Sequence, residues 1–164
     1  MQAMRVLRLV THARTRQPVL LLGEVDGERC VPIFLRRPQA DVIAIGPRDD
    51  SVPGMTQDLL VPVVAQLGHP LVGVEITALV EGAYSAELVF ESGTRVEARP
   101  SDVLALAVRE GLPIGMAESI LDEVGQPIAE LFPDGGDSPP EEQMKEFREF
   151  LDDVSPEDFS NPSS

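Results

Sequence analysis

The segment from Pro100 to Arg109 is the feature that most constrains the fold. It reads as a helix with apolar side chains on every face, and such a helix must be buried among other elements. Pro100 favours the helical value of φ at the start, and Gly111 follows the last turn. Arg99 and Asp102 are therefore held at a rigid junction beside a buried helix. One interpretation is that the two side chains face a cleft and act on a phosphate or a metal. The other is that Asp102 only complements the helix dipole.

Alternating apolar and polar residues predict strands around this helix. Asp26 and Gly27 form a turn signal between two apolar runs, which indicates a hairpin. Thr56 is expected to cap a helix that Pro62 kinks or shortens. The predicted strands are 5–11, 19–25, 29–35, 71–80, 84–90, 95–98 and 113–116, and the predicted helices are 38–45, 56–67, 100–110 and 117–124. The prediction is one compact α+β domain of mixed strands and short helices.

Length and composition fit one core and a tail. The chain has 164 residues, of which 43% are hydrophobic, enough for a single domain, which we place at residues 1–132. Cys30 is the only cysteine, so no internal disulfide can form, and a buried, inert thiol is expected. We find no signal peptide and no apolar run long enough to cross a membrane. These features predict a cytoplasmic protein without a membrane partner.

The charge is negative in both parts of the chain. Residues 1–132 carry 18 acidic and 11 basic side chains, and residues 133–164 carry ten acidic and two basic ones. This balance argues against passive wrapping of nucleic acid, which depends on Lys and Arg. It does not exclude a nuclease, since bound Mg²⁺ or Mn²⁺ reverses the sign of a carboxylate site. The two histidines, His12 and His69, are expected at the surface.

Several short motifs, in order, carry a family resemblance. They are Gly27–Leu35, Thr56–Leu60, Leu67–His69, Val74–Ile76 and the Arg-Pro-Ser-Asp sequence at 99–102. Over roughly residues 4 to 130, this pattern resembles the bifunctional nuclease family of bacteria and plants. The resemblance implies a small α+β domain, a homodimer, and nuclease activity on DNA and RNA.

Four residues at these motifs are the predicted catalytic set: Arg29, Asp58, Arg99 and Asp102. Asp58 and Asp102 are the predicted ligands of Mg²⁺ or Mn²⁺, and Arg29 is placed to hold a scissile phosphate. Asp58 and Arg29 also have a structural interpretation. Asp58 can compensate the dipole of its own helix, and a partly buried Arg29 needs a carboxylate partner, for which Asp102 and Asp58 are candidates.

Two departures from the family pattern bear on catalysis. Where the family has Gly-x-x-Glu-Ala, this chain has Gln39 in place of the carboxylate; where the family has Thr-His-Asp-Leu, Gln57 replaces the imidazole. A neutral amide neither binds metal well nor transfers protons near neutral pH. The leading hypothesis is a divalent-metal-dependent nuclease acting on DNA or RNA. The alternative is a non-catalytic paralogue that binds a regulatory partner through its dimer surface or its acidic tail.

The tail begins with a composition break. Residues 133–140 are rich in Pro, Gly and Asp, which is typical of a linker. From Glu141 to Val154, apolar residues recur at helical spacing: Met144, Phe147, Phe150, Leu151 and Val154. This pattern predicts an amphipathic helix that docks on its own domain or dimer mate, or that is held out for a protein partner.

Overall fold

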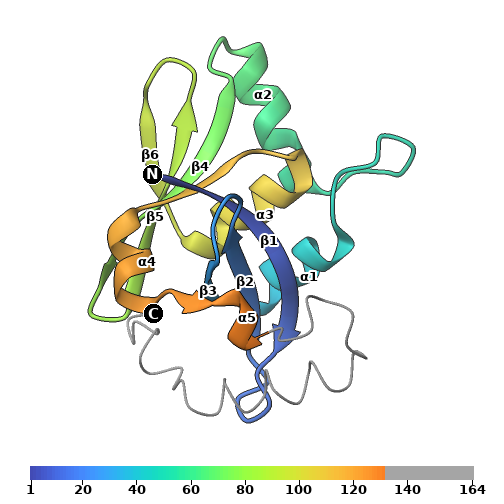
Figure 1. Ribbon diagram of the computed structural model, residues 1–164. Helices are drawn as coiled ribbons and strands as arrows, with labels where there is room; N and C mark the ends of the chain where they lie inside the picture. The colour runs from blue at the N-terminus through green and yellow to red at the C-terminus, as the bar shows by residue number, and fades with distance from the viewer. Residues whose placement is uncertain (132–164) are drawn as a thin grey trace.

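The computed structural model describes residues 1–131, which form one α+β domain around an eight-stranded mixed sheet (Figure 1). The strand order is β6-β5-β4-β7-β1-β2-β3-β8. Neighbouring strands are antiparallel except β4 and β7, which are parallel. The strands are β1 (Gln2–Thr11), β2 (Pro18–Glu24), β3 (Arg29–Phe34), β4 (Leu71–Val80), β5 (Ala83–Phe90), β6 (Arg95–Ala98), β7 (Ile114–Met116) and β8 (Gln126–Pro127). The predicted fold class is confirmed.

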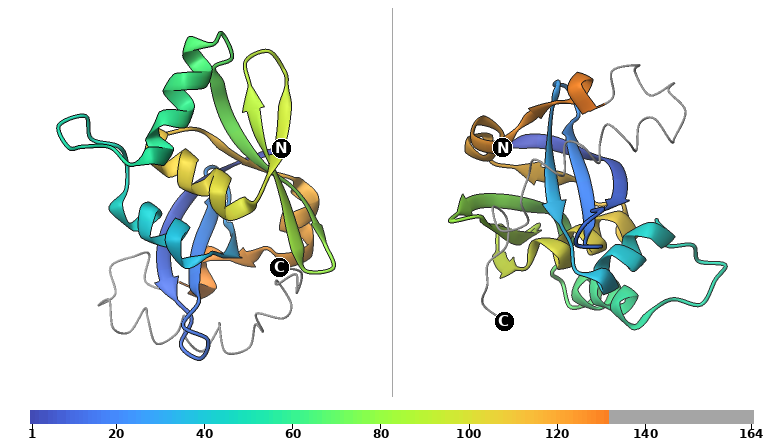
Figure 2. Two further views of the ribbon diagram at one scale, coloured as in Figure 1. Left: turned by 180° about the vertical axis from the view of Figure 1, so that it is seen from behind. Right: turned by 90° about the horizontal axis from the view of Figure 1, so that it is seen from below.

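Helices α1 (Arg37–Ile45), α2 (Leu60–Gln66) and α3 (Pro100–Glu110) pack together on one side of the sheet (Figure 2). Helix α3 contacts β4, β5 and α1. Its burial confirms the expectation from its apolar sequence; the buried residues are Ser101, Val103, Leu104, Ala105, Leu106, Ala107 and Arg109. The remaining helices are a 3₁₀ turn, η1 (Thr56–Leu59), which precedes α2, and the helices α4 (Glu118–Val124) and α5 (Ile128–Leu131).

Strand β2 is apolar on both faces because both are covered. Leu20 and Leu22 point into the main core with α1, α3 and α4, whereas Val19 and Leu21 belong to a second cluster on the opposite face. Successive side chains of a strand alternate between faces, so a continuous apolar run is expected only where neither face meets water. Cys30 lies in the second cluster and is buried, as expected from the sequence.

The region from Thr56 to Gln66 differs from the single predicted helix. Pro62 lies in the first turn of α2, where its missing N–H costs no helical hydrogen bond, so the α-helix restarts at Leu60 after η1. Thr56 does not cap the turn as predicted. Met55 occupies the cap position, and the Asp58 carboxylate accepts the hydrogen bond from its N–H at 2.8 Å.

At the start of α3, the cap position belongs to Arg99, whose side chain makes no capping hydrogen bond within residues 1–131. One further local prediction is wrong. His12 is buried rather than exposed, with 2% of its surface accessible. Its Nδ1 accepts from the Thr15 N–H at 3.2 Å and its ring packs against Phe34. His69 is exposed, as expected.

Among residues 1–131, no helix has the length and apolar character needed to span a membrane. The predicted helix at 141–154 lies outside the described residues.

Candidate functional site

A small pocket forms where the first turns of α1, η1 and α3 meet. It has a volume of about 170 Å³, and Leu60, Ala105 and Leu106 form its apolar lining. Its polar residues are Gln39 near the start of α1, Gln57 in η1, and Asp102 in the first turn of α3. Both amides that depart from the family pattern therefore lie in one pocket with Asp102.

Asp102 is engaged through both of its carboxylate oxygens. Gln39 Nε2 donates to Oδ1 at 2.8 Å, and Arg99 Nε donates to Oδ2 at 2.6 Å. The Arg99 side chain is 57% exposed, so its guanidinium lies at the surface. The structure thus brings together two of the four predicted residues, Arg99 and Asp102.

Each amide leaves one polar atom unsatisfied. Gln39 Oε1 and Gln57 Nε2 are buried, and within the described part of the chain neither has a hydrogen-bond partner. A buried polar atom without a partner is costly and is usually satisfied by water or by a ligand. The pocket therefore offers one acceptor and one donor to a polar group that enters it.

Asp58 forms a buried ion pair away from this pocket. Arg109 donates to it from Nε at 3.1 Å and from Nη2 at 2.8 Å, and both side chains are almost fully buried. Arg109 Nη1 also donates to the Gly46 carbonyl at 3.0 Å. Because the Arg109 guanidinium donates to Asp58, the pKa of this carboxyl lies below its usual value. The pair joins η1, α3 and the end of α1, which is a structural role.

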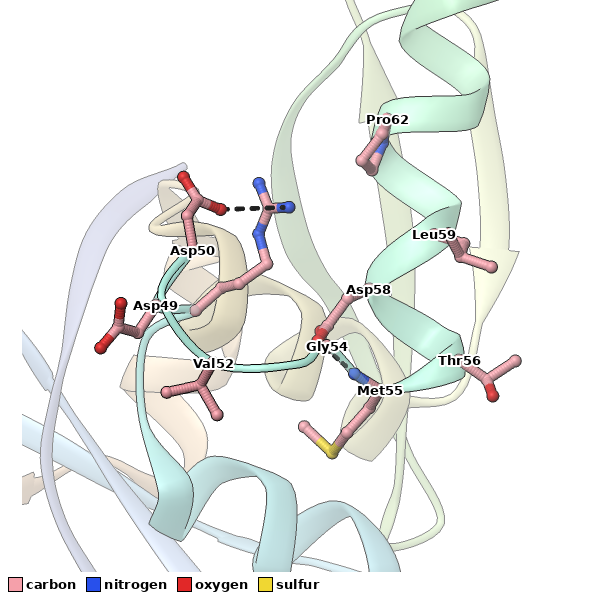
Figure 3. Close-up of a pocket in the computed structure, with 10 residues that line it drawn as sticks. Asp49, Asp50, Val52, Gly54, Met55, Thr56, Asp58, Leu59 and Pro62 are labelled. Atoms are coloured by element: carbon pink, nitrogen blue, oxygen red, sulfur yellow. Dashed lines mark hydrogen bonds and ion pairs between the residues drawn. The ribbon is translucent and has the colours of Figure 1, made fainter.

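Figure 3 shows the larger pocket that Asp58 lines, with a volume of about 470 Å³. Its other charged residues are in the exposed loop before η1, where Arg48 Nη1 lies 3.7 Å from Asp50 Oδ1. The two predicted metal ligands, Asp58 and Asp102, therefore line different pockets.

The Asp58 pair predicts an acid-sensitive stability. A carboxyl whose folded-state pKa is lowered stabilises the fold above its unfolded pKa of 3.8, and this contribution is lost as the pH falls through the folded value. We expect the melting temperature of the parent protein to decrease once the pH is lowered past about 4. The melting temperature of an Asp58→Asn variant should decrease less over the same pH range, since Asn does not titrate. Parallel thermal scans from pH 6 to pH 2.5 measure the difference, and equal slopes would contradict it.

Arg29 does not contact Asp102 or Asp58, the partners suggested from sequence. Its guanidinium binds Glu24 at 2.7 Å, Glu118 at 2.6 Å and Asp122 at 3.0 Å. These contacts join the β2–β3 hairpin to α4, and they hold the pKa of the Glu24 and Glu118 carboxyls below the usual value. Arg29 thus links the hairpin to α4 and does not line the amide pocket.

The amide pocket does not fit Mg²⁺ or Mn²⁺ well. Mg²⁺ requires a near-octahedral set of oxygen ligands and usually carboxylates. The pocket supplies one carboxylate, and both of its oxygens already accept hydrogen bonds. Among residues 1–131, no group of three or more His, Cys, Asp or Glu is placed to hold a metal ion.

Sequence reasoning missed the partners that decide these roles, namely Arg109 for Asp58 and Glu24 for Arg29. One signal was present. Arg109 lies on a helix with apolar side chains all round, and a buried Arg requires a carboxylate.

Comparisons with known proteins agree with the motifs. Residues 20–129 match the family model described as the bifunctional nuclease domain. Two relatives from Mycobacterium tuberculosis, the uncharacterized proteins MT1877 (strain CDC 1551 / Oshkosh) and Rv1829 (strain H37Rv), are each 39% identical over 165 residues. Each match covers 97% of this chain and 98% of the relative. The chain therefore belongs to the bifunctional nuclease family.

Proposed function

We propose that this chain is a partner-binding member of the bifunctional nuclease family that does not hydrolyse DNA or RNA with a divalent metal. The observation that carries this proposal is the composition of the pocket, in which Gln39 and Gln57 stand beside a single, fully engaged carboxylate, Asp102. An amide provides neither the charge that holds Mg²⁺ nor the titration that moves a proton.

An exposed apolar surface adjoins the pocket and supports a binding role. Helix α2 contains no buried residue, although its sequence is almost entirely apolar. Leu60, which also lines the pocket, is 42% exposed, and Val63 and Leu67 on the same face are 49% and 70% exposed. Leu59 at the end of η1 extends this α2 surface. Grouped large aliphatic side chains in water mark interaction sites.

Hydrolysis assays test the proposal directly. The purified full chain is incubated with single-stranded DNA, duplex DNA and RNA, in Mg²⁺, Mn²⁺ or chelator. The matched control is Asp102→Asn, which keeps an acceptor for Gln39 but removes the charge. We expect no divalent-dependent cleavage above this control. Cleavage that requires Mg²⁺ or Mn²⁺ and disappears in Asp102→Asn would overturn the proposal.

A divalent-metal-dependent nuclease is the second candidate. Family membership and the exposed Arg99, held by Asp102 beside the pocket, favour it. An Arg guanidinium suits contact with a phosphate. The same assay separates the two candidates, since only the nuclease loses activity in chelator.

The α2 surface predicts the effect of a charge on association. Leu67→Asp replaces a side chain that is 70% exposed, so the fold should persist with a melting temperature within a few degrees of the parent. The family resemblance implies a homodimer. If the α2 surface forms its interface, the variant should be monomeric under conditions where the parent is dimeric. Light scattering coupled to gel filtration measures this, with Val96→Asp on β6 as the control. A dimer that is equally stable in all three proteins would exclude α2 from the dimer interface.

A further inference from the structure

We propose that residues 141–154 of this chain dock on the outer face of strands β1, β2 and β3. We define this outer face by the apolar side chains that lie opposite the main core: Leu7, Val10, Val19, Leu21, Cys30 and Phe34. The inference is independent of the function proposed for the amide pocket.

The outer face is an apolar surface that spans three strands. Val10 pairs with Val19, which pairs with Phe34, so the three form one row across the sheet. Val19, Leu21 and Cys30 are fully buried. Yet α1, α2 and α3 lie together on the opposite side (Figure 2). Within residues 1–131, the helical residue that packs against this cluster is Ile128 of α5.

One arginine lies on the outer face, and two more stand in the segments that adjoin its strands, although the domain as a whole is acidic. Arg8 is the cross-strand neighbour of Leu21, so its side chain lies on the outer face. Arg14 belongs to the loop between β1 and β2, and Arg36 follows the end of β3. Residues 133–164 carry ten acidic and two basic side chains. The acidic segment should therefore dock on the outer face, beside these arginines, in preference to the α2 surface, since α2 itself contains no charged residue.

The segment at 141–154 has the matching apolar stripe. Met144, Phe147, Leu151 and Val154 recur at spacings of three and four residues, which places them on one face of a helix, with Phe150 at its border. The family match ends at residue 129, whereas the two relatives align over 97% of this chain. Their similarity therefore continues through most of the tail, as expected if the tail belongs with the domain.

The connection is long enough and begins in the right place. Helix α5 ends at Leu131, and its Ile128 already contacts the outer face. Residues 132–140 span at most about 30 Å when extended, whereas the seven residues of β2 span about 23 Å. Every point on the outer face is therefore within reach of residue 141 of the same chain.

Cys30 provides a native probe for the test. It is the only cysteine, it lies in the outer face, and burial raises the pKa of its thiol to about 12. We expect Phe147→Ala with Phe150→Ala, in the full chain, to increase the rate of Cys30 labelling by a thiol reagent at least tenfold under native conditions. The matched control, Glu142→Ala with Lys145→Ala, changes the polar face of the segment and should label at the parental rate.

A second variant tests the charge contribution. Arg8→Glu places a negative charge beside Leu21, and we expect it to accelerate Cys30 labelling several-fold. Circular dichroism and urea titration of each variant establish that faster labelling does not come from global unfolding. The labelling rate should not change when the parent protein is diluted, because the segment belongs to the same chain.

Three results would overturn the proposal. One is a parental labelling rate in the Phe147 and Phe150 double variant. Another is acceleration that is fully explained by a lower urea midpoint. The third is protection of Cys30 that disappears on dilution, which would assign the cover to a second copy of the chain.

Discussion

Replacing Asp58 by Ala is expected to lower the free energy of unfolding by about 3–5 kcal/mol, because it leaves the Arg109 guanidinium buried without its carboxylate. The change also removes the acceptor of the Met55 N–H, which starts η1. For a domain of this size, the loss corresponds to a fall in melting temperature on the order of 10 °C. Calorimetry or thermal circular dichroism measures it.

A double-mutant cycle separates the ion pair from its surroundings. Asp58→Leu alone and Arg109→Met alone each leave one charge buried without its partner, whereas the double variant with these same two substitutions removes both charges together. We expect the double variant to be more stable than the sum of the single losses predicts, since replacing both partners avoids an unpaired buried charge. The matched surface control is Glu87→Ala. It removes one of the two acidic partners of the exposed Arg95, with Glu75 as the other, and should change the melting temperature little. Additive losses would show that Asp58 and Arg109 act independently.

The local elements were predictable because their signals are local. The Asp26-Gly27 turn lies between β2 and β3, and the apolar segment after Pro100 is the buried helix α3. The hairpin loop is longer than a two-residue turn, since β2 ends at Glu24 and β3 begins at Arg29. The Glu24 carboxylate lies so close to Gly27 that a Cβ atom at residue 27 would clash with it. This close approach brings Glu24 to Arg29, and the turn signal alone does not reveal it.

Long-range pairing was not predictable from the sequence. Strand β7 inserts between β4 and β1, parallel to the first and antiparallel to the second. The alternation of a three-residue strand carries no information about its neighbours. The same limit applies to side chains. Gln39 and Asp102 are 63 residues apart and meet because α1 packs on α3, whereas the sequence alone identified each residue only through its motif.

The catalytic and metal-binding roles of the four residues stay predictions. Arg99 and Asp102 lie together beside a buried helix. Asp58 and Arg29 each form an ion pair, with Arg109 and Glu24 as the partners, and neither pair was expected from the sequence. Some family motifs contain residues that form ion pairs within the fold, and others contain residues that line a pocket. An isolated motif does not show which of these two roles its residues have.

The second large effect is expected from replacing the two amides of the pocket, Gln39 and Gln57. Gln39→Glu places a carboxylate 2.8 Å from Asp102 Oδ1, on the side chain that now donates a hydrogen bond. Two carboxylates at this distance repel each other unless a proton or a cation lies between them. With Gln57→His as well, the pocket gains a carboxylate and an imidazole beside Asp102, a set that can bind a divalent ion. We expect this double variant to be less stable than the parent in chelator and to regain stability as Mn²⁺ is added.

Activity should follow the metal in that variant. If Gln39 and Gln57 replace catalytic groups, then Gln39→Glu with Gln57→His should produce Mn²⁺-dependent cleavage of nucleic acid on the order of 10²-fold above the assay background that the parent gives. Each single change should have little effect, because groups that act together are not additive. Adding Asp102→Asn should abolish the gain. A double variant that folds and binds Mn²⁺ but does not cleave would show that the two amides serve packing or partner binding, and that loss of catalytic groups does not explain them.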